Sequence, residues 1–179
     1  MKRLLIPFIL FILLTVEGVA LDILPVSLIK SDLIFVPHWD FVFIILIAIF
    51  YDREDTYFSV FYGLLFGLMT DIVYTGVLGP YMFSYALSAY MVHGLIKLLH
   101  ANFVVTIILA IAGLLMADIF INVIFSVTSL ADISWWDYVI KRLLPTVGAN
   151  MVFLLAAYPI AVNPLTKWKK ERSSGKSGF

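Results

Sequence analysis

Long apolar segments alternate with short polar stretches along this chain, and the alternation predicts its elements. A helix rises about 1.5 Å per residue, so roughly 20 apolar residues cross the hydrocarbon core of a bilayer. The pattern therefore predicts an all-α, polytopic membrane protein with about six transmembrane helices in one bundle. The predicted spans cover residues 4–21, 39–51, 56–74, 81–99, 103–127 and 138–162.

Two of these regions allow more than one interpretation. Residues 39–51 are short for a full crossing, which favours a tilted or protein-buried helix over a lipid-facing one. The preceding residues 22–37 mix prolines and charges with apolar side chains, so they are predicted to lie on the membrane surface or partly re-enter it. The first span could also be a cleavable signal peptide, because it has a basic start and the small residues Gly18-Val19-Ala20 near its end.

Composition identifies lipid as the solvent of this chain. Of its 179 residues, 63% are hydrophobic and only 13% are charged, which is more apolar surface than a soluble domain of this size can bury. The formal net charge is zero, so charge gives no indication of nucleic-acid binding. Cysteine is absent from the sequence and the three histidines lack metal-ligand spacing, so no metal and no cofactor are predicted.

The distribution of Lys and Arg predicts the orientation of the bundle. The positive-inside rule places both termini in the cytoplasm. Residues 1–163 then form a single membrane domain, and residues 164–179 form a basic cytoplasmic tail that is predicted to be disordered. The tail is either a topology signal only or also a binding segment for anionic lipid headgroups. The predicted cytoplasmic side carries Lys2, Arg3, Arg53, Lys97, Lys167, Lys169, Lys170, Arg172 and Lys176, and the other side carries Lys30, Lys141 and Arg142.

Small residues recur every four positions in the third span and lead to an acid. Ser59, Gly63, Gly67 and Asp71 share one helix face, and Gly79 follows in a short turn. Small side chains let helix backbones approach closely, which predicts tight packing against a neighbouring helix or a partner's span. An unpaired carboxylate in hydrocarbon is costly, so Asp71 is predicted to support the outer turn and the packing around it.

Other polar residues interrupt the apolar spans at similar depths. Glu17, Asp71 and Asp118 fall in the outer half of the bilayer, and Lys141 and Arg142 enter the last span at a comparable height. We expect one outer polar cluster in which these acids face these bases, with the amides of residues 75–79 as alternative partners for Asp71. The cluster is either a set of neutralising pairs or a substrate or ion pocket. The prediction also includes the polar residues Asn122, on the helix face of Asp118, and Asn150, in the last span.

Motifs for catalysis are missing from the sequence. It contains no phosphate-binding loop, no His-Glu-x-x-His and no Gly-x-Ser-x-Gly. The loops are too short to form a soluble active-site domain. An enzyme is therefore not predicted.

One stretch resembles the central signature of a known family. Gly63-Leu-Leu-Phe-Gly-Leu-Met-Thr-Asp71 is followed by Val77-Leu78-Gly79 and by an apolar span with Tyr85 and Tyr90. This stretch resembles MreD, the rod shape-determining membrane protein family of bacteria. The specific match covers about a quarter of the chain, and the length and predicted topology also agree.

The resemblance implies a noncatalytic scaffold of the bacterial cell-elongation machinery in the inner membrane. Members associate with the single-pass protein MreC. With it they help MreB, RodA and a class B penicillin-binding protein insert lateral-wall peptidoglycan and control cell shape. The family is thought to share its fold with the substrate-binding subunits of energy-coupling-factor transporters. The alternative function is therefore a substrate-binding membrane subunit of a vitamin-type transporter.

Overall fold

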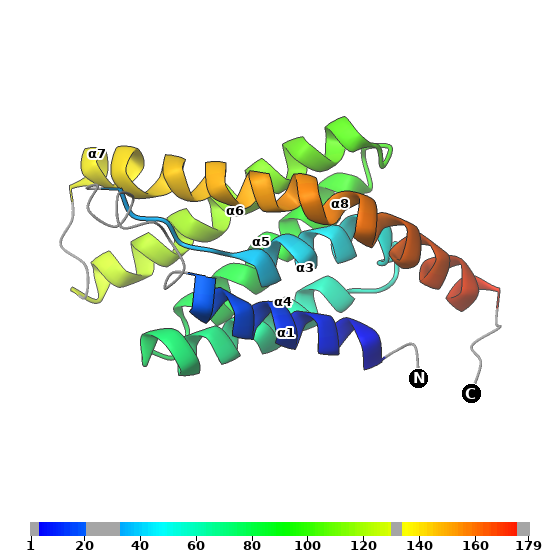
Figure 1. Ribbon diagram of the computed structural model, residues 1–179, viewed down its shortest axis with the longest axis horizontal. Coiled ribbons are helices and arrows are strands. Elements are labelled where there is room, and N and C mark those ends of the chain that lie inside the picture. Colours follow the sequence, from blue (N-terminus) through cyan, green and yellow to red (C-terminus); the bar gives the residue numbers. More distant parts are fainter. Residues whose placement is uncertain (1–3, 21–32, 130–133, 175–179) are drawn as a thin grey trace.

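The computed structural model describes residues 4–20, 33–129 and 134–174, and these residues form a bundle of helices (Figure 1). Between α4 and α5, and again before α8, the chain passes through a π-helical turn, labelled η2 and η3. The predicted all-α fold class is confirmed. The elements in chain order are α1 (Leu5–Ala20), α3 (Trp39–Phe50), α4 (Phe58–Thr70), η2 (Asp71–Thr75), α5 (Pro80–Ile96), α6 (Phe103–Val127), α7 (Trp135–Tyr138), η3 (Val139–Leu143) and α8 (Leu144–Ser173).

Three helical stretches of the described chain are long and apolar enough to cross a membrane. They run over Phe58–Thr75, Phe103–Val127 and Trp135–Arg172. The shorter apolar helices are α1 and α3. The exposed surface of α1 is rich in large apolar side chains, which a bilayer can solvate.

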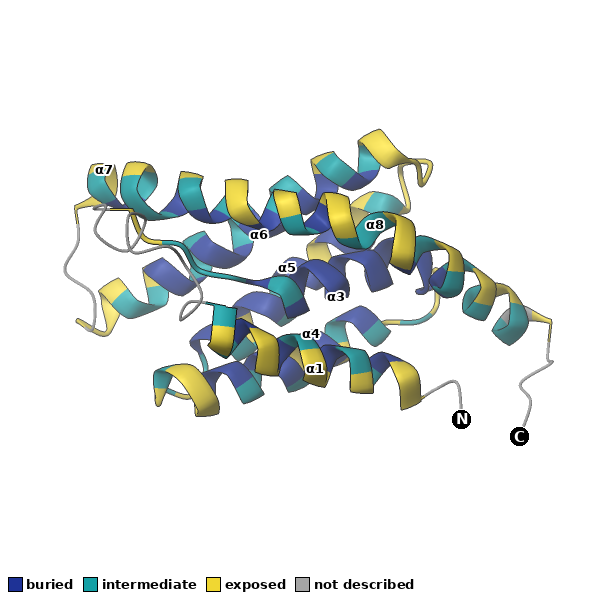
Figure 2. Cartoon of the chain, viewed as in Figure 1, coloured by how far each residue is buried: buried dark blue, intermediate teal, exposed yellow. Residues whose placement is uncertain are grey.

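The short helix α3 is the centre of the bundle. Every residue from Asp40 to Phe50 is buried, and α1, α4, α5, α6 and α8 all pack against this helix (Figure 2). A helix that is apolar on all sides needs protein or lipid on all sides. The expectation that residues 39–51 form a protein-buried helix is therefore confirmed.

The most extensive helix–helix contact of the described chain is between α4 and α5. They are joined by η2 and a short turn in which Gly76 and Gly79 adopt positive φ angles of 67° and 121°. A residue with a Cβ rarely adopts such angles, so these glycines permit the sharp reversal. Pro80 follows at the first turn of α5, where a missing N–H costs nothing.

The C-terminal helix is longer than the sequence predicts. α8 continues to Ser173, so the expectation of disorder is wrong for residues 164–173. Leu165 is fully buried and Trp168 packs on the hydrophobic core, and these contacts hold the basic segment as a helix. Residues 175–179 of the predicted tail lie outside the described chain.

The beginning of α1 and the end of α8 lie at the same end of the molecule (Figure 1). α1 packs against α3 and α4 through one face that contains Ile6, Leu10 and Leu14. The cleavable signal peptide stays an alternative prediction. The possible cleavage site ends at Ala20, and residues 21–32 lie outside the described chain.

Candidate functional site

Asp71 is fully buried and binds the first amides of α5. Its carboxylate accepts hydrogen bonds from the backbone N–H groups of Gly79 at 2.8 Å, Tyr81 at 2.9 Å and Met82 at 3.1 Å. The first N–H groups of a helix have no partner within the helix, and the helix dipole favours a negative charge there. Asp71 thus satisfies three donors at once and closes the turn between α4 and α5.

The stripe of small residues that precedes Asp71 faces α5. A Cβ added at Gly63 would lie 3.0 Å from the carbonyl oxygen of Tyr85, and one at Gly67 would lie 2.6 Å from that of Tyr81. Real Cβ atoms essentially never come as close as the distance at Gly67, and the distance at Gly63 is shorter than most real Cβ contacts. Only glycine therefore permits this separation of the two helices, a contact of the small-residue type found between membrane helices.

Asp52 binds the first backbone amides of α4, as Asp71 binds those of α5. Its carboxylate accepts the backbone N–H groups of Phe58 at 3.0 Å and Ser59 at 2.9 Å, and the Ser59 hydroxyl at 2.6 Å. Ser59 is thereby fixed at the first turn of the small stripe. Burial raises the pKa of Asp52, while the hydrogen bonds from Ser59 and Phe58 act in the opposite direction.

Glu17 provides a third carboxylate at a helix start. It extends from α1, and its Oε1 accepts the backbone N–H of Asp40 at 2.7 Å in the first turn of α3. Asp40 in turn accepts the N–H of Phe41. The three helices α3, α4 and α5 therefore each begin at an acid that belongs to an earlier part of the chain.

Asp118 of α6 is a buried acid that pairs with an arginine. Its Oδ1 lies 3.3 Å from an Arg142 nitrogen and 3.6 Å from His38 Nε2. The Tyr138 hydroxyl donates to Oδ2 at 2.7 Å. His38 Nδ1 lies 2.7 Å from the Tyr85 hydroxyl, which extends the contacts to α5. This buried group links α5, α6, the start of the last span and the segment before α3.

The predicted outer cluster of three acids facing two bases is therefore corrected in its pairing. Arg142 binds Asp118, whereas Lys141 binds Asp137 at 2.8 Å near the surface. Asp71 binds amides of the turn and of α5, and Glu17 binds an amide of α3. Unsatisfied N–H groups at helix starts are strong donors within the apolar interior, and they hold these acids without a basic side chain. Asn122 is buried one turn beyond Asp118 on α6.

Asn150 binds a non-helical segment of the chain. Residues 33–38 are extended, and Asn150 accepts the His38 N–H at 2.8 Å and donates to the Val36 carbonyl at 2.9 Å. The Thr146 hydroxyl accepts the Val36 N–H at 3.2 Å. In a membrane, irregular backbone is tolerated only where such groups find partners. That residues 22–37 lie on the membrane surface or partly re-enter it stays a prediction, and residues 22–32 lie outside the described chain.

Replacing Asn150 by leucine is expected to release this segment. Leu removes one acceptor and one donor and leaves buried amide groups unsatisfied, at a cost of about 1–3 kcal/mol for each. Because the chain lacks cysteine, Ile34→Cys provides a single label site. Labelling at this site by a water-soluble maleimide should be faster in the Asn150→Leu protein. The matched control is Asn163→Leu, an exposed position on the same helix. Equal rates in all three proteins would contradict the role of Asn150.

Sequence reasoning missed His38, Asp40, Asp52, Tyr85 and Tyr138 as parts of these contacts. Asp40 and Asp52 flank the apolar run of α3, which is the one signal that could have indicated them. The aromatic hydroxyls gave no signal, because tyrosine is common in membrane helices near the interface. Among the described residues, no group of three or more His, Asp or Glu is placed to hold a metal ion.

These observations define an all-helical bundle with three helical stretches apolar enough to cross a membrane, in which several buried acids bind the starts of its own helices. A family profile described as rod shape-determining protein MreD matches residues 2–167. The chain belongs to the MreD family. It is similar to the rod shape-determining protein MreD of Bacillus subtilis (strain 168), with 26% identity over 155 residues that cover 87% of this chain and 88% of the relative. No solved structure matches the chain, so the likeness to transporter substrate-binding subunits stays a prediction.

Proposed function

We propose that this chain is a noncatalytic membrane scaffold of the bacterial cell-elongation machinery. Membership of the rod shape-determining family implies a role in cell shape. The finer proposal is that the chain binds MreC directly and acts with MreB, RodA and a class B penicillin-binding protein in lateral peptidoglycan synthesis. It would do so in the inner membrane with both termini in the cytoplasm, which the excess of Lys and Arg on that side supports.

The observation that carries the proposal is that the buried polar side chains bind backbone groups of the chain itself. Asp71, Asp52 and Glu17 bind backbone amides of helix starts, and Asn150 binds the extended segment. Intramembrane acids of transporters and pumps normally face a partner or cavity through which substrate passes. Here Asp71, Asp52 and Glu17 accept hydrogen bonds from the chain itself. A rigid bundle of this kind suits the binding of other membrane proteins better than turnover.

The transporter alternative receives less support from the described residues. α3, with every residue from Asp40 to Phe50 buried, fills the middle of the bundle. Two hollows of the described residues, at Thr56–Tyr62 and at the end of α8, are open at the surface of the protein. Small-molecule sites usually bury most of their ligand in an enclosed, largely preformed cavity.

Depletion of the protein from a rod-shaped host is the experiment that tests the proposal. We expect rounded and widened cells with mislocalised wall synthesis, together with loss of MreC from material purified through the elongation complex in mild detergent. Re-expression of the wild-type chain is the control and should restore both. Cells that keep their shape but require an added vitamin would contradict the scaffold and support the transporter subunit.

A further inference from the structure

The last turns of α8 have two different faces. One face contacts the bundle through Ala161, Leu165, Trp168 and Arg172, which are spaced by four, three and four residues and so lie in one helical row. The Arg172 guanidinium lies 4.7 Å from the ring centroids of both Tyr51 and Phe58, and it donates to the Thr56 hydroxyl at 3.0 Å. The basic end of α8 is therefore docked at the start of α4.

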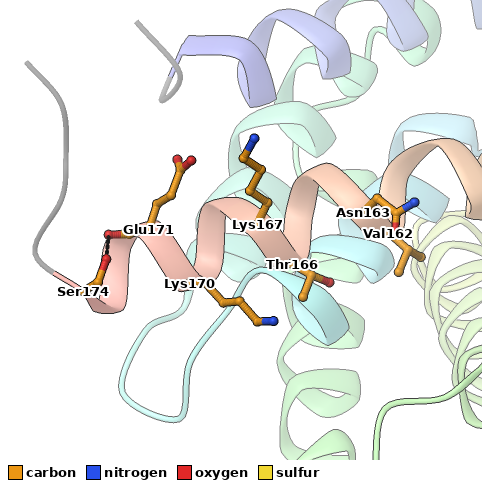
Figure 3. Close-up of a pocket in the computed structure, with 7 residues that line it drawn as sticks. All are labelled: Val162, Asn163, Thr166, Lys167, Lys170, Glu171 and Ser174. Carbon is orange, nitrogen blue, oxygen red and sulfur yellow. Dashed lines mark hydrogen bonds between the residues drawn. The ribbon is translucent and has the colours of Figure 1, made fainter.

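The opposite face of the same turns is polar and exposed. It lines an open hollow of about 710 Å³ along the helix (Figure 3). Lys167 and Lys170 line this hollow from its two edges and point in opposite directions in Figure 3, and Glu171, on the side of Lys167, contributes the one acid of the lining. Counting these three charges gives a positive balance of one. The residues of the lining that can donate hydrogen bonds are Asn163, Thr166, Lys167, Lys170 and Ser174.

On the same face of α8, a row of apolar residues precedes the polar residues of the hollow. Val152 is 69% exposed and Ile160 is 76% exposed, and with Ala156 they are spaced by four residues. Ile160 and Lys167 are seven residues apart, so their side chains lie on nearly the same side of α8. Along this one face the surface changes from apolar to basic within about 10 Å, by the rise of a helix. A molecule that lies lengthwise on it would meet hydrocarbon first and then positive charge.

We propose that this face of α8 binds an anionic phospholipid. The acyl chains lie along Val152, Ala156 and Ile160, and the phosphate lies between Lys167 and Lys170. Charge complementarity favours an acidic over a zwitterionic headgroup, since basic groups at the membrane surface attract anionic lipid. The docking of Arg172 and Trp168 on the bundle fixes the helix turns that carry both lysines, which reduces the entropy lost on binding. The inference requires membrane insertion only and does not depend on the proposed scaffold role.

Native mass spectrometry of the full chain in detergent tests this proposal with phosphatidylglycerol and phosphatidylcholine as probes. The wild type should retain phosphatidylglycerol in preference to phosphatidylcholine. The double variant Lys167→Gln/Lys170→Gln should lose affinity for phosphatidylglycerol by roughly fivefold for each lysine. The control Arg53→Gln/Lys141→Gln removes the same charge from two other sites and should bind as the wild type. Glu171→Gln removes the acid of the lining and should bind more tightly.

Three results would overturn the lipid site. The first is unchanged phosphatidylglycerol binding in the double variant when it elutes from size exclusion as the wild type does. The second is an equal loss in the control variant, which would show that net charge alone attracts the lipid. The third is displacement of the lipid by inorganic phosphate at matched concentration, which would show a simple anion site.

Discussion

Asp71→Leu is expected to abolish most of the folded protein. The Asp71 carboxylate accepts three backbone N–H groups, and leucine leaves all three donors without an acceptor in a buried turn. Hydrogen bonds to a charged group contribute about 1.5–3 kcal/mol each, so the total loss is on the order of 5 kcal/mol or more. That is comparable with the whole stability of a typical domain. The start of α5 should fray, and with it the contact between α4 and α5.

Asp71→Asn is expected to fall between the wild type and Asp71→Leu. The amide oxygen of asparagine can replace one carboxylate oxygen, but its NH₂ group would face a backbone donor. The first measurement is the fraction of protein that stays monodisperse after heating in mild detergent. The second is whether each variant complements a strain depleted of the protein. Asp55→Asn and Asp55→Leu are the controls, because Asp55 is exposed in the loop before α4. An Asp71→Asn protein that stays abundant and folded but fails to complement would show that the charge itself has a function.

The spans of the bundle could be predicted because their signals are local. In lipid, an apolar segment must hydrogen-bond its own backbone N–H and C=O groups, so it forms a helix. This rule applies whatever the neighbouring helices are. The same reasoning indicated that residues 39–51 are buried, since they are too short to cross alone. The helix over residues 164–173 could not be found in this way, because Leu165 and Trp168 support it through contacts with distant segments.

Part of the site's residues could be named from the sequence, but most of their partners could not. Depth matched Asp71 with Lys141 and Arg142, and of the alternative partners, the amides of residues 75–79, the structure places Gly79 against Asp71, together with amides of α5 that were not predicted. The choice depends on where helices begin relative to one another, and a sequence does not contain that relation in a local pattern. Arg142 and Asp118 did fall in one predicted group, because both lie on long helices whose depth is easily counted.

Gly67→Ala is expected to separate α4 from α5. The new Cβ would lie 2.6 Å from the Tyr81 carbonyl oxygen and 2.8 Å from Met82 Cα, both backbone atoms that cannot rotate away. The helices would have to move apart by roughly 1 Å along a tightly packed interface, and such overpacking costs about 1–3 kcal/mol or more. The same shift would lengthen the hydrogen bonds between Asp71 and α5, so the two sites should be coupled.

Gly94→Ala is the matched control for Gly67→Ala. A Cβ at Gly94, in the helix α5, meets nothing within 4 Å. The same methyl group therefore only raises the helix propensity at this position. We expect the midpoint of thermal aggregation in detergent to fall by several degrees for Gly67→Ala and to stay or rise for Gly94→Ala. Gly63→Ala should lie between them, because its closest contacts are 3.0–3.1 Å. If Gly67→Ala and Gly94→Ala gave the same midpoint, α4 and α5 could not be as close as the structure places them.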